Sequence, residues 1–205
     1  MSRYTWLLDP GHGGIIDGVY QTAGKRSPIF PDGSVLYEGE FNRSVVKHLL
    51  KFCQKGNIEA IDVVDSLEDI PLRKRVAEAN KLHREKGSCV YISIHANGFG
   101  NGKDFNNAKG ICTFHHHKSS AGKMLANNLQ KHLCNLTGFR DRGAVSNEAW
   151  ANFYVLRKTN MPAVLSENGF MTNYEDARAL MDPVVQKKVA LAHYNMIREV
   201  ERNGF

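Results

Sequence analysis

The chain has 205 residues, of which 42% are hydrophobic and 23% are charged, and its formal net charge is +6. This length corresponds to about one globular domain, and no segment is long and apolar enough to span a membrane. A positive charge favours polyanionic partners, but the basic residues are scattered and no nucleic-acid recognition motif is present, so no nucleic-acid partner is expected.

The N-terminus, MSRYTWLLDPGHGG, lacks the basic start and apolar run of a secretory signal. We therefore expect synthesis in the cytoplasm without stable membrane insertion. The four cysteines, Cys53, Cys89, Cys112 and Cys134, form no CxxC pair and fall in apolar segments. Buried free thiols are the prediction.

Short apolar stretches alternate with amphipathic ones along the chain. Strands are predicted at 3–8, 58–64, 89–94, 111–115, 153–156 and 163–165. Helices are predicted at 41–55, 71–84, 120–136 and 183–202, with Gly56 and Gly138 as stops and Pro71 in a first turn. This alternation predicts one α/β domain with helices on both faces of a mainly parallel sheet.

One connection is unusually long. Residues 13–37 are rich in Gly, Pro, Asp and Ser and contain no predicted helix. Long loops inside compact domains are often functional, so this loop is a candidate to take part in a site.

Three predicted strands are followed by residues capable of chemistry. His12 follows the first strand in LLDPGHGG, His95 follows a central strand in VYISIHANG, and Glu167 follows a late strand in PAVLSENGF. Sites in open α/β sheets gather at the carboxyl ends of the strands, so these three side chains are expected to converge. Glu38, at the start of the first helix, fits beside them.

Two histidines and one carboxylate form a common ligand set for a catalytic zinc ion. A further carboxylate nearby would then serve as general base, taking a proton from water and passing it to the leaving nitrogen. From the residues alone, either Glu38 or Glu167 fits either role.

Each of these residues also has a purely structural interpretation. His12 lies among turn-forming residues, and taken alone a turn role is favoured. His95 could equally be a hydrogen-bonded core histidine, and both Glu38 and Glu40 suit a first helical turn because of the helix dipole. Glu167 is harder to dismiss, because a buried carboxylate needs a partner.

The run from His115 to His117 also resembles a metal site. Alternate residues of a strand face opposite sides, so all three cannot bind one ion. We interpret the run as mostly non-ligating, with one member able to line a cleft.

Taken together, the motifs resemble the zinc-dependent N-acetylmuramoyl-L-alanine amidases of the type called amidase 3. The shared elements are Asp9 to Gly14 (DPGHGG), Glu38 with Asn42, the helix with Leu72, Arg75, Ala79 and Asn80, Ser93 to Asn97 (SIHAN), Arg142-Gly143, the NFYVLR strand at 152–157, and Pro162 to Phe170. They occur in the same order over nearly the whole chain. The chain departs from the family pattern at Val64-Asp65-Ser66, at Cys112 and in the longer loop before Glu38.

The resemblance implies zinc ligands at His12, Glu38 and His95 and a catalytic Glu167, with Glu40 as the rival to Glu38. It also implies a single catalytic domain over 1–205 with a six-stranded, mostly parallel, phosphorylase/hydrolase-like sheet, and no separate wall-binding domain is expected. The implied reaction cleaves the amide between the lactyl group of N-acetylmuramic acid and L-alanine in peptidoglycan. A monomer is expected.

Other functions remain open from the sequence. A zinc peptidase could use the same chemistry on another peptidoglycan amide, and a wall-binding module could keep the fold without catalysis, although retention of all four residues argues against it. A phage or prophage endolysin, released to the wall at lysis, fits the lack of a signal. A bacterial remodelling enzyme whose signal has been removed fits as well.

Overall fold

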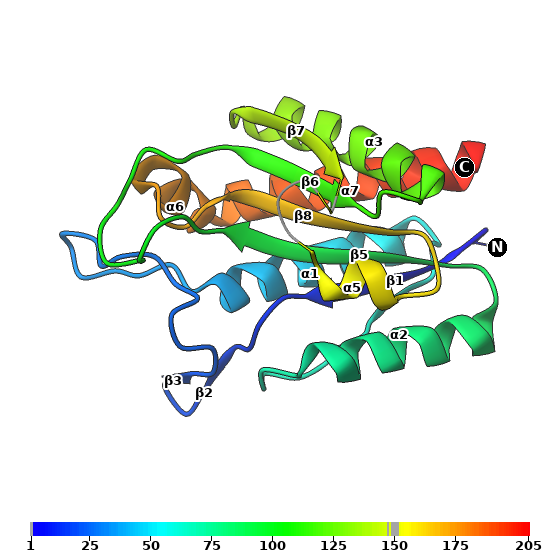
Figure 1. Ribbon diagram of the computed structural model, residues 1–205, viewed down its shortest axis with the longest axis horizontal. Helices are drawn as coiled ribbons and strands as arrows, with labels where there is room; N and C mark the ends of the chain where they lie inside the picture. The colour runs from blue at the N-terminus through cyan, green and yellow to red at the C-terminus, as the bar shows by residue number, and fades with distance from the viewer. Residues whose placement is uncertain (1, 147, 149–151) are drawn as a thin grey trace.

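The computed structural model describes residues 2–146, 148 and 152–205. A six-stranded sheet with the order β4-β1-β5-β8-β6-β7 runs through the molecule (Figure 1). Its strands are β1 (Thr5–Pro10), β4 (Ala60–Asp62), β5 (Cys89–Asn97), β6 (Ile111–His115), β7 (Asp141–Ser146) and β8 (Ala163–Phe170). The four strands β4, β1, β5 and β8 are parallel, whereas β6 is antiparallel to β8 and parallel to β7.

The central strands are buried on both faces, which explains their continuous apolar sequences. All six residues of β1 and all eight of β8 are buried. Alternate side chains enter two separate cores: Trp6 and Leu8 face one, and Leu7 faces the other.

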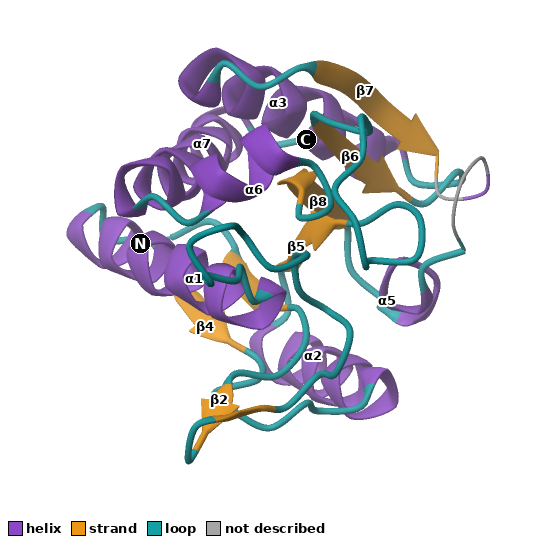
Figure 2. Ribbon diagram, turned by 90° about the vertical axis from the view of Figure 1, so that its left-hand side faces the viewer, coloured by secondary structure: helices purple, strands orange, loops and turns teal. Residues whose placement is uncertain are grey.

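Helices cover both faces of the sheet (Figure 2). The helices α1 (Glu38–Lys55), α3 (Ser120–Thr137) and α7 (Pro183–Asn203) pack on the face of Trp6 and Leu8. The helices α2 (Leu72–Lys86) and α5 (Tyr154–Lys158) pack on the face of Leu7. A short helix, α6 (Tyr174–Leu180), follows β8. The predicted α/β architecture, with its mostly parallel six-stranded sheet, is confirmed.

One predicted strand is wrong, and one observed strand is not among the predictions. Residues 153–156, and the NFYVLR segment that contains them, form no strand: Tyr154–Lys158 is the short helix α5, which buries Val155 and Leu156. The sixth strand is instead β7, at the edge beside β6, where no residue is fully buried and the sequence DRGAVS carries no apolar pattern. The four long helices lie within three residues of their predicted bounds.

The cysteines are free, as predicted, with Cys53, Cys89 and Cys112 buried and Cys134 half-buried. The long loop contains a small hairpin, β2 (Ile15–Ile16) with β3 (Val19–Tyr20). Within the described residues, no helix has the length and apolar character to cross a bilayer.

Candidate active site

His12 lies just beyond the end of β1, held in an unusual backbone conformation. Its φ of 65° is in the left-handed region, which non-glycine residues seldom adopt. Two guanidinium groups hold its carbonyl oxygen, with Arg43 donating at 2.8 Å and Arg75 at 2.9 Å. These bonds fix the direction in which the imidazole leaves the strand.

A buried ion pair between Arg75 and Asp9 stabilises the turn that carries His12. Arg75 donates to Asp9 Oδ1 at 2.6 Å and to the Pro10 carbonyl at 2.7 Å. The second oxygen of Asp9 accepts bonds from the hydroxyls of Tyr91 and Ser93, both at 2.7 Å. Burial would raise the pKa of Asp9, but the charge of Arg75 and these hydroxyls outweigh it and lower the pKa. The carboxylate therefore stays ionised and keeps its ion pair with Arg75.

Gly11 allows β1 to pass close to His95. A Cβ atom built on Gly11 would overlap the imidazole ring of His95. Pro10 pairs with Ile94 in the parallel ladder, and the Gly11 amide donates to the Ile94 carbonyl at 3.0 Å. The strand pairing therefore places His12 and His95 beside each other, with ring centroids 5.1 Å apart.

Glu38 is the first residue of α1 and is 2% exposed. The helix N-terminus has no side-chain cap of its own; instead the long loop supplies one. The Glu38 amide donates to the Lys25 carbonyl at 3.0 Å, and the Gly39 amide donates to the Tyr20 hydroxyl at 2.9 Å. The Tyr20 hydroxyl in turn donates to the Lys25 carbonyl at 3.0 Å. The loop thus fixes where Glu38 enters the site.

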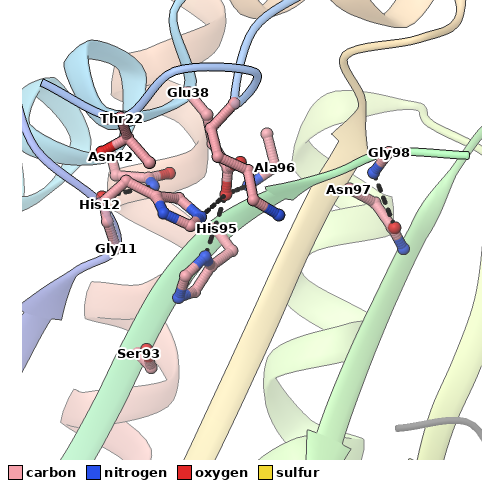
Figure 3. A network of polar contacts seen from close by, with 12 residues as sticks. Gly11, His12, Thr22, Glu38, Asn42, Ser93, His95, Ala96, Asn97 and Gly98 are labelled. Atoms are coloured by element: carbon pink, nitrogen blue, oxygen red, sulfur yellow. Dashed lines mark hydrogen bonds and ion pairs between the residues drawn. The ribbon is translucent and has the colours of Figure 1, made fainter. Parts of the chain in front are cut away.

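The carboxylate of Glu38 lies between the two imidazoles (Figure 3). Its Oε1 is 2.9 Å from His95 Nδ1 and 3.2 Å from His12 Nε2, and it accepts a bond from the Ala96 amide at 3.2 Å. One ligand atom from each of His12, Glu38 and His95 lies within 4.8 Å of the other two, which is the spacing a single metal ion requires.

Electrostatics favour the charged carboxylate at this position. Burial would raise the pKa of Glu38, but the two imidazoles outweigh it and hold the pKa at about 2. Burial would lower the pKa of His95, but its contact with Glu38 outweighs that effect and raises the pKa. The cluster therefore stabilises a carboxylate and, at His95, a positive charge.

Glu167 lies on β8, directly opposite His95 of β5 in the parallel ladder. It is 8% exposed, and its Oε2 has no hydrogen-bond partner within the described residues. Burial raises its pKa to about 8; the charge of Glu38 adds to this effect, while those of His95 and Lys25 oppose it. A carboxyl group with such a pKa can both accept and donate a proton near neutrality.

A bulge in β8 follows Glu167. The ladder shifts register between the pairs His95–Glu167 and Asn97–Phe170, and Gly169 has a φ of 120°. The side chain of Asn168 donates to the His95 carbonyl at 2.9 Å. Bulges commonly re-aim a side chain next to an active site.

A series of buried hydrogen bonds connects this bulge to α7. Asn168 donates to Ser166 Oγ at 3.0 Å, and Ser166 Oγ is 2.9 Å from His193 Nε2 on α7. Ser166, Asn168 and His193 are each 0% exposed, and His193 Nδ1 is 2.8 Å from the Val189 carbonyl. The segment that carries Glu167 is therefore tied to α7.

These residues open into one cleft of about 420 Å³. His12, Glu38, His95 and Glu167 lie in it, so the structure brings all four predicted residues together. Its walls come from further segments that include the loop around Lys25, the 97–102 turn with Phe99, and α5 with Tyr154. The sequence marks the 13–37 loop as a candidate, but it does not show which residues line the cleft, because these residues meet the site only through long-range folding.

Two other predicted candidates lie elsewhere. The carboxylate of Glu40 accepts a bond from the Ile15 amide at 3.0 Å and lines no part of the cleft. The strand β6 runs antiparallel to β8, so His115 pairs with Val164 at the end of the sheet away from Glu167. His117 instead contacts Glu148 at 3.0 Å. None of the residues from His115 to His117 lines the cleft.

Near the carboxyl ends of the central strands, the site combines two histidines and a carboxylate with a further buried carboxylate. This arrangement is typical of metal-dependent hydrolases. The model of the N-acetylmuramoyl-L-alanine amidase family matches residues 7–199. The chain belongs to this family of hydrolases.

Known proteins resemble the chain over most of its length. An uncharacterized cell wall amidase of Bacillus anthracis is 35% identical over 198 residues, covering 93% of this chain and 34% of that protein. An endolysin of Bacillus phage SPP1 is 32% identical over 203 residues, covering 98% of this chain and 66% of that protein. The crystal structure of an N-acetylmuramoyl-L-alanine amidase from Clostridium difficile 630 superposes with a TM-score of 0.79 at 29% identity, covering 100% of both chains. The chain thus spans only about a third of the length of the Bacillus anthracis relative.

Proposed function

We propose that this chain hydrolyses the amide bond between the lactyl group of N-acetylmuramic acid and L-alanine in peptidoglycan, using a zinc ion held by His12, Glu38 and His95 and using Glu167 as general base. The observation that carries the proposal is the convergence of the three ligand atoms within 4.8 Å of one another, in a cleft that also contains Glu167.

The donor set suits zinc better than a harder cation. Calcium and magnesium prefer sets of oxygen ligands, whereas two imidazoles and one carboxylate suit zinc and leave a position open to the reactants. When bound, the ion supplies Lewis-acid polarisation of a carbonyl oxygen and activates water as a nucleophile at neutral pH. The ionised state of Glu38 meets the requirement for a deprotonated ligand.

Glu167 suits the proton transfers. Its Oε2 has no partner among the described residues and is thus able to accept a proton from the attacking water. Its raised pKa allows the same group to pass that proton to the leaving nitrogen of L-alanine. Glu38 is less suited, because its carboxylate is already engaged by both histidines.

The remaining parts of the proposal concern the setting. We propose that residues 1–205 act as one catalytic domain and that a monomer suffices, since a single chain supplies all four site residues. The likeness to an endolysin of Bacillus phage SPP1 supports a phage lysis setting, with action on the cell wall. Likeness to a cell wall amidase of Bacillus anthracis supports the same substrate.

The proposal is tested by digesting purified peptidoglycan with the protein, with and without a chelator, and identifying the released fragments by mass spectrometry. We expect stem peptides that begin with L-alanine, lost with the chelator and restored by zinc. Metal-dependent release of fragments cut elsewhere in the stem would instead identify a zinc peptidase. Binding to the wall without any released fragment would identify a non-catalytic module.

A further inference from the structure

The long loop places one lysine beside the proposed metal ligands. The Lys25 carbonyl accepts bonds from the Glu38 amide and from the Tyr20 hydroxyl, both at 3.0 Å. Its backbone is therefore tied directly to that of a proposed metal ligand, and its position relative to the cleft is set by the fold.

Other contacts hold the loop on either side of this residue. Towards the N-terminal side, the hydroxyl of Thr22 accepts a bond from the Gly13 amide and donates to Asp69, both at 2.8 Å. Towards the C-terminal side, Phe30 packs against Phe105 and Tyr174, with ring centroids 4.7 and 5.1 Å apart. A loop anchored at both ends presents Lys25 at a defined place.

The side chain of Lys25 is exposed and lines the cleft. Within the described residues, its ammonium group forms no ion pair and no hydrogen bond. The neighbouring Arg26 also lines the cleft, but its guanidinium donates to the Ser27 carbonyl at 2.9 Å. Among the described residues, Lys25 is thus the cleft cation whose donors are all available to a ligand, whereas Arg26 has one donor already engaged.

The chemistry of the proposed substrate determines which anionic group can bind the ammonium group of Lys25. The lactyl carboxyl of N-acetylmuramic acid is consumed in the scissile amide, so the sugar side of that bond carries no nearby carboxylate. On the peptide side, L-alanine is followed by a D-glutamate residue linked through its side chain, which leaves its α-carboxyl as a carboxylate or as an amide. The nearest anion therefore belongs to the peptide.

We infer that Lys25 is a specificity-determining residue that binds the α-carboxylate of the second stem residue. This inference rests on the proposed amidase function. It places the stem peptide along the 13–37 loop, and it means that the enzyme distinguishes stems with a free α-carboxyl from stems in which that group is amidated. An exposed ion pair contributes up to about 1 kcal/mol, so the preference is about fivefold.

The test uses two muropeptides that differ only in whether the D-glutamate α-carboxyl is free or amidated. The zinc-loaded wild-type protein is expected to cleave the free acid with a kcat/KM about fivefold higher. Lys25→Met should abolish this preference, and Lys25→Arg should retain it. Lys51→Met, which removes an exposed charge outside the cleft, is the matched control and should keep the wild-type preference.

Binding of the product dipeptide gives a second readout that requires no turnover. Calorimetry should show tighter binding of L-alanyl-γ-D-glutamate than of its α-amide to the wild-type protein, and equal binding to Lys25→Met. Equal cleavage of both muropeptides by the wild type would overturn the inference while leaving the amidase function intact. An equal loss on both substrates in Lys25→Met would also overturn it, and cleavage of neither substrate by the wild type would overturn the proposed function itself.

Discussion

At the scale of single residues, the contacts of Glu38 and Glu40, and not their positions in the sequence, show which of the two is suited to bind a metal ion. Both are acidic residues in the first turn of α1. The carboxylate of Glu38 faces two imidazoles, whereas that of Glu40 accepts a bond from the Ile15 amide. We therefore expect Glu38→Gln to lower zinc affinity roughly a hundredfold or more, since even losing a group that only supports a ligand costs ten- to a hundredfold.

Glu40→Gln is the matched control, because it removes the same charge from the same helical turn. Zinc affinity is measured by competition with a chelating dye. A loss of affinity in Glu40→Gln with none in Glu38→Gln would reverse the proposed ligand assignment.

At the scale of elements, α7 is coupled to β8 by a histidine that burial keeps neutral. Burial lowers the pKa of His193 to about 4, against 6.5 for an ordinary histidine. Between these values the unfolded chain binds a proton that the folded protein excludes. This contribution to stability is complete above pH 6.5 and is lost as the pH falls towards 4.

The two pKa values correspond to about 3 kcal/mol. Urea unfolding of the wild type at several pH values should show this loss, and His193→Gln should show a smaller decrease over the same interval. His132→Gln, which changes a half-buried histidine that contacts Glu199 on the surface, serves as control. Identical pH dependence in the wild type and in His193→Gln would contradict the assignment.

The elements also show where sequence reasoning succeeds and where it does not. The long helices and central strands were predictable because their apolar periodicity reflects burial directly. The apolar run from Phe153 to Leu156 predicts a strand, but a run this short fits either structure, and here the backbone forms α5. The strand β7 could not be predicted, because pairing with β6 and not apolar content makes it a strand.

At the scale of the whole molecule, the candidate site joins four chain segments that are far apart in sequence. Topology explains why much of it was predictable: β1, β5 and β8 are adjacent and parallel, so residues after their apolar cores meet at one end. The supporting contacts were not predictable. Neither the guanidinium groups that hold the His12 carbonyl nor the placement of Lys25 follows from local pattern, because both depend on contacts between distant segments.

The central claim is that binding and proton transfer are divided among these residues, with His12, Glu38 and His95 holding zinc and Glu167 moving the proton. The most direct measurement is metal content and release of L-alanine stem peptides, determined together on wild-type protein and on Glu167→Gln. We expect both proteins to hold one zinc ion, and the variant to release stem peptides about a hundredfold or more slowly. Full activity in Glu167→Gln, or loss of its zinc, would contradict this division of roles.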